Sequence, residues 1–177
     1  MKTTGLKKGT VKVLQHQASW HTNFEKEKEL ILSIKSKYIK DVRHVGSTSI
    51  PNMPAKPIID IIIGIDNFYN ASKLIKSLAK IGYEFRLKPR KFQWLFVKKE
   101  GDNETHYLKI LRYKGNYWNK CIKFREVLMN AKKVFEQYKK IKLELEKNYG
   151  DNRVEYTKKK NNLLAKIKSL KKYIDIS

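Results

Sequence analysis

The chain has 177 residues and a hydrophobic content of 41%, which suits one folded domain and argues against intrinsic disorder. It contains no run of about 18 apolar residues, so no membrane span is expected. The single cysteine cannot form an internal disulfide, and the first eight residues lack an apolar signal core, so we expect a cytoplasmic protein.

The net charge of +23 comes from 40 basic and 17 acidic residues and permits binding to polyanions. The lysines are spread along the whole chain and do not gather in one segment. A diffuse excess of positive charge attracts any anion, including nucleic acid, but it provides no specificity for a nucleotide sequence. We therefore expect mostly solvated surface charge, and nucleic acid stays an open alternative as partner.

The first part of the chain combines helical and extended patterns. Residues 1–10 are predicted to form a flexible end, and residues 11–177 a single domain. Asn23 is the expected cap of the first helix, and Asp66 or Asn67 that of the second. The predicted elements are a strand at 11–14, a helix at 23–38, strands at 42–45 and 58–65, a helix at 66–80, and strands at 83–87, 92–98 and 105–112. The last two strands are expected to form a hairpin.

From Gly115 onward the apolar residues recur at helical spacing, which predicts a helical C-terminal part over about residues 115–175. Gly150 breaks the second of its helices, Asp151 is the expected cap of the third, and Ile174 ends the apolar stripe. Strands mixed with helices, followed by helices alone, indicate a small mixed β-sheet flanked by helices, in the α/β (α+β) class.

The segment from residue 44 to residue 65 joins two predicted strands by a loop of chemically useful residues. Gly46 can adopt a positive φ, and the three hydroxyl residues that follow it can cap a helix or hold an anion. Asp60 interrupts the second strand, which is otherwise almost entirely β-branched. Because a buried carboxylate is costly without a partner, we expect Asp60 to face a cation, a metal ion or a polar cleft.

These residues resemble a known family. The strings His44-Val-Gly-Ser-Thr-Ser-Ile-Pro51 and Ala55-Lys-Pro-Ile-Ile-Asp-Ile61 are similar to the signature of the GrpB family, small bacterial proteins of the nucleotidyltransferase (DNA polymerase β-like) superfamily. The similarity extends over roughly residues 11 to 168. Further matches are Trp20, Phe24, Glu27, Gly82-Tyr83, Thr105-His106, Phe124-Arg125, Tyr156 and Lys160.

The resemblance implies a nucleotidyltransferase fold and a site for a nucleoside triphosphate with Mg²⁺. In the superfamily the Gly-Ser pair contacts phosphate and carboxylates hold the metal, which joins the attacking and leaving oxygens. It therefore implies phosphate contacts at Gly46 and Ser47, and a metal-binding, catalytic carboxylate at Asp60. The hydroxyl of Thr48 adds a further candidate phosphate contact. The alternative for Ser47, Thr48 and Ser49 is a plain helix cap.

Four further residues have two interpretations each, and a fifth, His106, has one. Lys56 is either a neutralising partner of the strand carboxylate or a phosphate contact. Arg125 likewise pairs with that carboxylate or binds phosphate through its planar fork, and Lys160 contacts phosphate or lies on a solvated face. His44 is a structural histidine or a general base, and we favour His106 as a site residue because the resemblance includes it.

The chain also departs from the superfamily pattern. Active members usually carry a second acidic residue two positions after the first, and here that position is Ile62. Asp66 lies about 20 Å further along an extended strand, too far to share a metal. The third carboxylate is replaced by His106, so the expected Mg²⁺ site is weak.

Three functions follow as hypotheses. The first is nucleotidyl transfer from a nucleoside triphosphate to a small molecule or RNA, with His106 or His44 acting on the acceptor. The second is a non-catalytic or accessory module that binds a nucleotide or phosphate-bearing metabolite. The third is a basic nucleic-acid-binding protein. The sequence does not indicate an oligomeric state.

Overall fold

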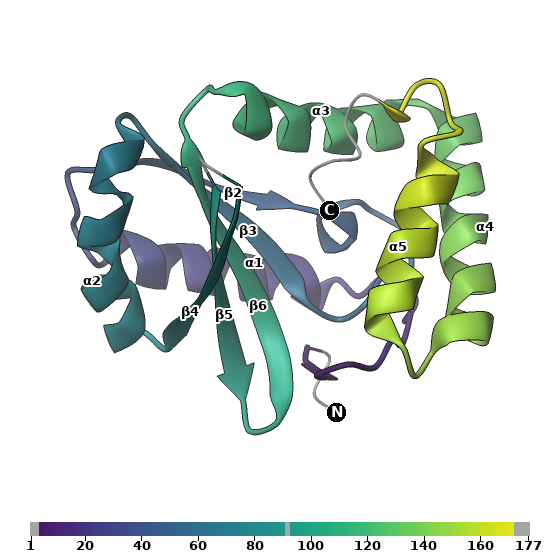
Figure 1. Ribbon diagram of the computed structural model, residues 1–177, viewed down its shortest axis with the longest axis horizontal. Coiled ribbons are helices and arrows are strands. Elements are labelled where there is room, and N and C mark those ends of the chain that lie inside the picture. The colour runs from purple at the N-terminus through teal and green to yellow at the C-terminus, as the bar shows by residue number, and fades with distance from the viewer. Residues whose placement is uncertain (1–3, 91–92, 172–177) are drawn as a thin grey trace.

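The computed structural model describes residues 4–90 and 93–171, and its centre is a six-stranded mixed β-sheet (Figure 1). The strand order is β2-β3-β6-β5-β4, and the short β1 pairs with β6. β3 and β6 are parallel, and the other paired strands are antiparallel. The strands are β1 (Leu6–Lys7), β2 (Ile39–Val45), β3 (Ile59–Ile65), β4 (Tyr83–Arg90), β5 (Gln93–Glu100) and β6 (Asn103–Arg112).

One face of the sheet is sealed by apolar side chains. Along β3 the alternate residues Ile59, Ile61, Ile63 and Ile65 are all fully buried in the largest core cluster. They pack under α1 (Ser19–Leu32), the 3₁₀ segment η2 (Phe68–Leu74) and α2 (Ile75–Lys80). Since successive side chains of a strand point to opposite faces, the other β3 residues face the C-terminal helices.

The second face is only partly covered. Ile62 packs against Trp118 and Cys121 of α3 (Asn116–Asn130). At Gly64 a Cβ would lie 2.9 Å from the Trp118 ring, so the glycine allows this close approach. α4 (Lys132–Tyr149) and α5 (Arg153–Leu164) lie side by side beyond the end of the sheet (Figure 1). The part of the second face around Asp60 therefore opens into a cleft.

The predicted mixed sheet flanked by helices is confirmed, including the β5–β6 hairpin and the three C-terminal helices. The predicted cap Asn67 is also confirmed, because its side chain accepts a hydrogen bond from the Tyr69 amide, although the first turns form η2. Among the described residues, no helix has the length and apolar character needed to cross a membrane. Ile174 lies outside the described residues.

Several local expectations are wrong. The flexible end contains β1, which pairs with β6 and buries Leu6. The strand expected at 11–14 reduces to one bridge between Leu14 and Ala55. α1 begins at Ser19, so Asn23 lies inside the helix and its amide donates to Thr4. The cap of α5 is not Asp151 but Asn152, whose side chain accepts from the Glu155 amide.

Candidate functional site

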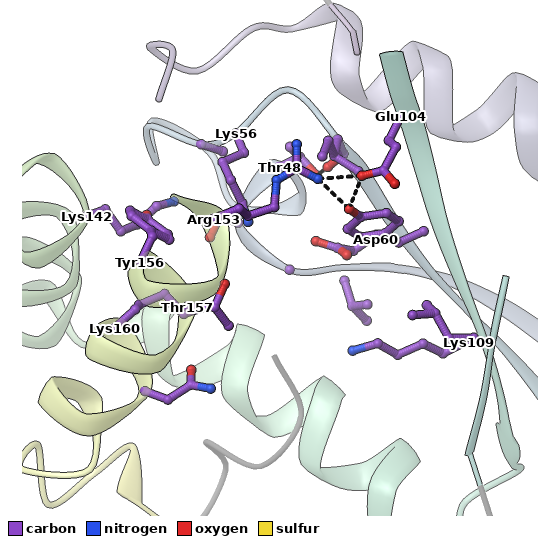
Figure 2. A pocket seen from close by; sticks show the side chains of 18 of the residues that line it. Thr48, Lys56, Asp60, Glu104, Lys109, Lys142, Arg153, Tyr156, Thr157 and Lys160 are labelled. Atoms are coloured by element: carbon purple, nitrogen blue, oxygen red, sulfur yellow. Dashed lines mark hydrogen bonds and ion pairs between the residues drawn. The ribbon is translucent and has the colours of Figure 1, made fainter. Parts of the chain in front are cut away.

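A cleft of about 760 Å³ lies between the open part of the sheet and the C-terminal helices. Figure 2 shows Asp60 and Lys109 on its sheet side, and Lys142, Tyr156 and Lys160 on its helical side. Its walls are mostly apolar and include the side chains of Leu95, Phe124, Tyr107 and Tyr138. A concave, largely apolar space with a few converging polar groups is the usual form of a small-molecule site.

Gly46 and Asp60 face each other where β2 and β3 open into the cleft. Asp60 lies beside Val45 on β2 and Tyr107 on β6. Gly46 has φ +69° and ψ −173°, a conformation that essentially only glycine adopts, and its predicted positive φ is confirmed. A Cβ at this position would lie 3.0 Å from the Cβ and Cγ atoms of Asp60. The glycine thus lets the chain turn directly against the carboxylate.

The hydroxyl residues after Gly46 form the 3₁₀ turn η1 (Ser47–Ser49), and their side chains bond within the protein. Ser47 Oγ lies 3.1 Å from the hydroxyl of Tyr138, and Thr48 Oγ1 lies 3.0 Å from His44 Nε2. Ser49 Oγ donates to the Gly46 carbonyl over 2.7 Å. These bonds fix the turn at the cleft wall, where Ser47 and Thr48 still line the cavity.

Four lysines from four different elements line the cleft around Asp60, namely Lys56, Lys109, Lys142 and Lys160. Lys142 is buried and donates to the Pro54 carbonyl. Lys56 extends over an aromatic ring of α5, with its Nζ 5.4 Å from the ring centroid. Within the part of the chain that the structure describes, Asp60, Lys56 and Lys160 form no hydrogen bond and no ion pair through their side chains.

Burial and the neighbouring charges shift the pKa values of these groups. Burial lowers the pKa of Lys160 to about 7, and repulsion from Lys56 adds to the shift. Burial also lowers the pKa of Lys56 to about 8, with Arg153 as the next cause. Burial raises the pKa of Asp60, although the surrounding lysines, Lys109 first, oppose that shift. Each of these charges therefore costs free energy in the empty cleft.

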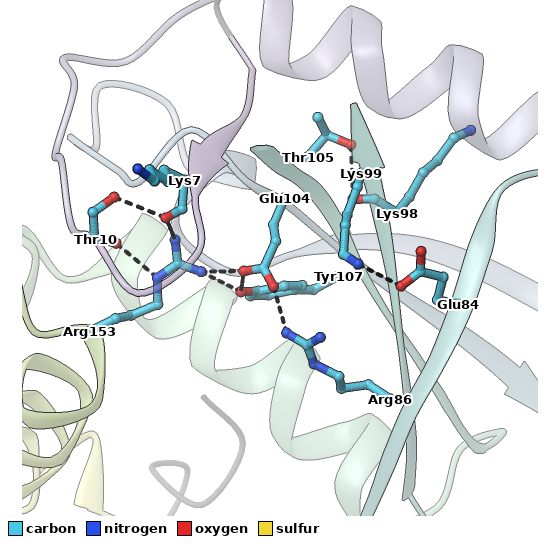
Figure 3. Close-up of polar contacts among 10 residues, drawn as sticks. All are labelled: Lys7, Thr10, Glu84, Arg86, Lys98, Lys99, Glu104, Thr105, Tyr107 and Arg153. Carbon is cyan, nitrogen blue, oxygen red and sulfur yellow. Dashed lines mark hydrogen bonds and ion pairs between the residues drawn. The ribbon is translucent and has the colours of Figure 1, made fainter. Parts of the chain in front are cut away.

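A second carboxylate of the cleft, Glu104, is fully paired (Figure 3). Arg86 donates to its Oε1 over 2.7 Å, while Arg153 and Tyr107 both donate to its Oε2 over 2.5 Å. Glu104 faces the cleft because the β5–β6 register shifts by one residue at Thr105. Burial alone would raise the pKa of Glu104, but these donors outweigh it and the pKa is lowered.

Arg153 also holds the N-terminal segment in place. Its Nε donates to the Thr10 carbonyl over 2.8 Å, and its Nη2 to the Lys7 carbonyl over 2.7 Å. One guanidinium at the start of α5 thus joins the segment before residue 11 to β6. These long-range bonds attach the described part of the expected flexible end to the rest of the fold.

Three predicted site residues lie away from this cleft. His44 faces the sealed side of the sheet, where its ring stacks on Phe24 at 4.7 Å. His106 pairs in the sheet with Ile59, so it too lies on the sealed side. Burial is the main cause that lowers the pKa to about 3 for His44 and about 4 for His106, so both are neutral at pH 7. Arg125 donates to the Ser49 carbonyl over 3.3 Å and contacts neither Asp60 nor the cavity.

The donor set of the cleft does not fit Mg²⁺. Mg²⁺ prefers several carboxylate or water oxygens in octahedral geometry. On β3 the position two residues after Asp60 is the buried Ile62, and on β6 the neighbour of Ile62 is Lys109. Glu104 already accepts from two arginines. In the described ranges there is no group of three or more acidic, histidine or cysteine side chains that could bind a metal.

The structure thus brings together Gly46, Ser47, Thr48, Lys56, Asp60 and Lys160 from the predicted site. Sequence reasoning missed Lys109, Lys142, Glu104 and Arg153. The available signal for Lys142 was its place on the apolar stripe of α4, between the buried residues Tyr138 and Leu145. Lys109 also had a signal, because it alternates with the buried Leu108 and Ile110 along β6.

Sequence comparisons identify proteins to which the chain is similar. A family model described as GrpB protein matches residues 10–170. The chain is 31% identical, over 168 residues, to the glutamate-rich protein GrpB of Alkalihalophilus pseudofirmus. That match covers 92% of this chain and 97% of the relative.

The fold is similar to those of solved structures. The crystal structure of the conserved protein GrpB from Enterococcus faecalis is similar with a TM-score of 0.79 at 26% identity, over 92% of this chain and 99% of that one. A structure of the Cid1 poly(U) polymerase with Mg 3′-dATP bound is similar with a TM-score of 0.53 at 13% identity. That likeness covers 76% of this chain and 42% of the polymerase, and it shows a nucleotidyltransferase-like fold.

Proposed function

The chain belongs to the GrpB family, and we propose that its cleft binds a nucleotide or another phosphate-bearing small molecule. The observation that carries the proposal is the pair of lysines Lys56 and Lys160, which line the cavity near Asp60 without a hydrogen bond or ion pair to any described residue. Buried charges are normally paired, so an unpaired ammonium group in a cavity favours an anionic ligand. A ligand phosphate supplies the missing charge.

The shape of the cleft supports the same class of ligand. Its volume of about 760 Å³ lies within the range of small-molecule and cofactor sites, about 300 to 1,000 Å³. The lysines surround Asp60, and Leu87, Leu95 and Val154 add apolar surface to the lining, with Leu95 beside Lys109 in the sheet. A molecule with a charged phosphate end and an apolar or aromatic end would satisfy both parts.

Nucleotidyl transfer is the second candidate, and the arrangement of Gly46, Ser47 and Asp60 on a nucleotidyltransferase-like fold favours it. The lone unpaired carboxylate argues against it, since Glu104 is held by Arg86 and Arg153. With this donor set we assign no step of the reaction to a metal ion. Binding without transfer is therefore the function that the cleft supports best.

A thermal-shift panel of nucleoside mono-, di- and triphosphates, each with and without Mg²⁺, tests the proposal. A ligand at about a hundred times its dissociation constant adds roughly 2.7 kcal/mol to the free energy of unfolding. We expect a shift that Lys160→Gln reduces strongly and Lys159→Gln leaves unchanged. Lys159 is a suitable control because it is the neighbouring residue of the same helix but is exposed and outside the cavity lining. No shift with any phosphate compound would overturn the proposal.

A further inference from the structure

The cleft places ammonium groups where a two-metal site would need carboxylates. On the sheet, Ile62 occupies the place of a second acidic residue, and the β6 residue beside it is Lys109. Lys56 reaches the cavity from the loop before β3, and Lys160 from α5. Ammonium groups and Mg²⁺ both neutralise phosphate oxygens, but a cleft lined with lysines repels a cation that arrives with the ligand.

We propose that the cleft binds the di- or triphosphate group of its ligand directly on lysine ammonium groups, as the metal-free anion, and takes up a proton when it does so. The inference rests on the proposed function, since it concerns the same cavity. Lys56 and Lys160 are the assigned contacts, and Gly46 and Ser47 line the same cavity. The fixed lysines replace the metal as the source of positive charge.

Proton uptake follows from the charges that surround Lys160. It faces Lys56 from the loop, Asp60 from β3, Lys109 from β6 and Lys142 from α4. Burial and Lys56 lower the pKa of Lys160 to about 7, so part of the population is neutral in the empty cleft at neutral pH. A phosphate dianion beside the amine favours the ammonium form, and the amine takes the required proton from the solvent.

The other groups change protonation in the same direction or not at all. The pKa of Lys56 is about 8, so an anion also completes its protonation. Burial raises the pKa of Asp60, and a nearby phosphate would raise it further. Burial also lowers the pKa of Lys142 well below its ordinary value, and repulsion from Lys160 and Lys56 adds to that shift, so an anion favours its ammonium form as well. Every titration in the cleft that responds to the anion therefore binds protons.

A nucleotide complexed with Mg²⁺ should bind more weakly than the free nucleotide. The metal cancels two negative charges of the phosphate chain and occupies oxygens that the lysines would contact. Among the described lining residues, Asp60 is the one carboxylate without an ion pair that the metal could bind, because Glu104 is held by Arg86 and Arg153. The direction of the magnesium effect thus separates this cleft from a metal-dependent transferase site.

Isothermal titration calorimetry on the full chain tests the inference, with tripolyphosphate and ATP as probes in EDTA or in excess Mg²⁺. Titrations in two buffers of different ionisation enthalpy, at pH about 6.5 and about 8.5, give the number of protons taken up. We expect binding in EDTA, weakening by Mg²⁺, and an affinity that falls up to about tenfold per pH unit for each proton above pH 7. Lys160→Arg should bind with a smaller pH dependence, and Lys159→Arg should match the wild type.

The outcomes separate this inference from the proposed function. Binding that requires Mg²⁺, or binding without proton uptake, would overturn the inference and leave nucleotide binding intact. Absence of binding for both probes under all conditions would overturn both. The measurements on the wild-type protein decide between these results even where a variant fails to fold.

Discussion

Two groups of charged side chains lie next to each other in the cleft. The charges of one group are paired by hydrogen bonds and ion pairs, and those of the other group are not. In the paired group, Glu104 accepts hydrogen bonds from Arg86, Arg153 and Tyr107. In the open group, Asp60 and two lysines carry their charges without hydrogen bonds or ion pairs to any described residue. Both groups combine a carboxylate with basic side chains, but only the paired group uses its charges to hold the fold together.

The difference teaches where to look for function. In the paired group, hydrogen bonds and ion pairs offset the free-energy cost of burying the charges. The same bonds join the N-terminal segment, β6 and α5. In the open group, attraction between Asp60 and the lysines only partly offsets the cost of burial, so the arrangement lowers the stability of the protein without a ligand. Sites of this kind are expected to trade stability for binding.

The largest expected effect is a loss of stability in Glu104→Gln. Removing one partner of a buried charge network leaves Arg86 and Arg153 without a counter-charge, and we expect the free energy of unfolding to fall by about 3 kcal/mol. Urea denaturation at neutral pH measures this loss. The same carboxylate-to-amide change at Asp60 is the matched control and should cost nothing. A loss under about 0.5 kcal/mol in Glu104→Gln would show that the two groups do not differ.

The second prediction concerns pH. The pKa of Lys160 is about 7 in the folded protein, against 10.5 for an ordinary lysine. Between these values the unfolded chain binds more protons, so the stability of the unliganded protein rises with pH, by about 1 kcal/mol per pH unit from this residue. In Lys160→Met that part of the slope should disappear, and Lys159→Met should keep it. If the free energy of unfolding rises equally with pH in the wild type and in Lys160→Met, the lowered pKa of Lys160 would be contradicted.

The open group was partly predictable from sequence. Asp60 interrupts an apolar strand, and Gly46 precedes three hydroxyl residues, so both were visible as local anomalies. Lys56 and Lys160 were identified through the family resemblance. Lys109 and Lys142 were missed because the chain has 40 basic residues, and only tertiary packing separates a cleft lysine from a solvated one.

The register of the sheet explains why His106 was wrongly expected at the site and why Glu104 was missed. His106 is beside Ile59 in the parallel β3–β6 pair, one residue out of step with Asp60, so the two side chains point to opposite faces. Glu104 reaches the cleft only through the register shift at Thr105. Local periodicity does not reveal the pairing of strands that are distant in sequence, such as β3 with β6, or the irregularity in the β5–β6 pair. By contrast, local periodicity does predict that the segments of β3 and β6 are strands, in which successive side chains point to opposite faces of the sheet.

The smallest expected effect, Asp60→Asn, gives the sharpest comparison. Burial raises the pKa of Asp60, so the folded protein binds a proton here more readily than the unfolded chain does. The ionised carboxylate therefore destabilises the fold above that pKa, and the cost is relieved as the pH falls through it. We expect Asp60→Asn to be more stable than the wild type at neutral pH, by an amount on the order of 1 kcal/mol that shrinks in acid. It should also keep or improve metal-free phosphate binding, because a repulsive charge is gone. A transferase site built on this carboxylate would instead lose its nucleotide in Asp60→Asn, so one variant measured by denaturation and calorimetry distinguishes a lysine-lined binding cleft from a metal site.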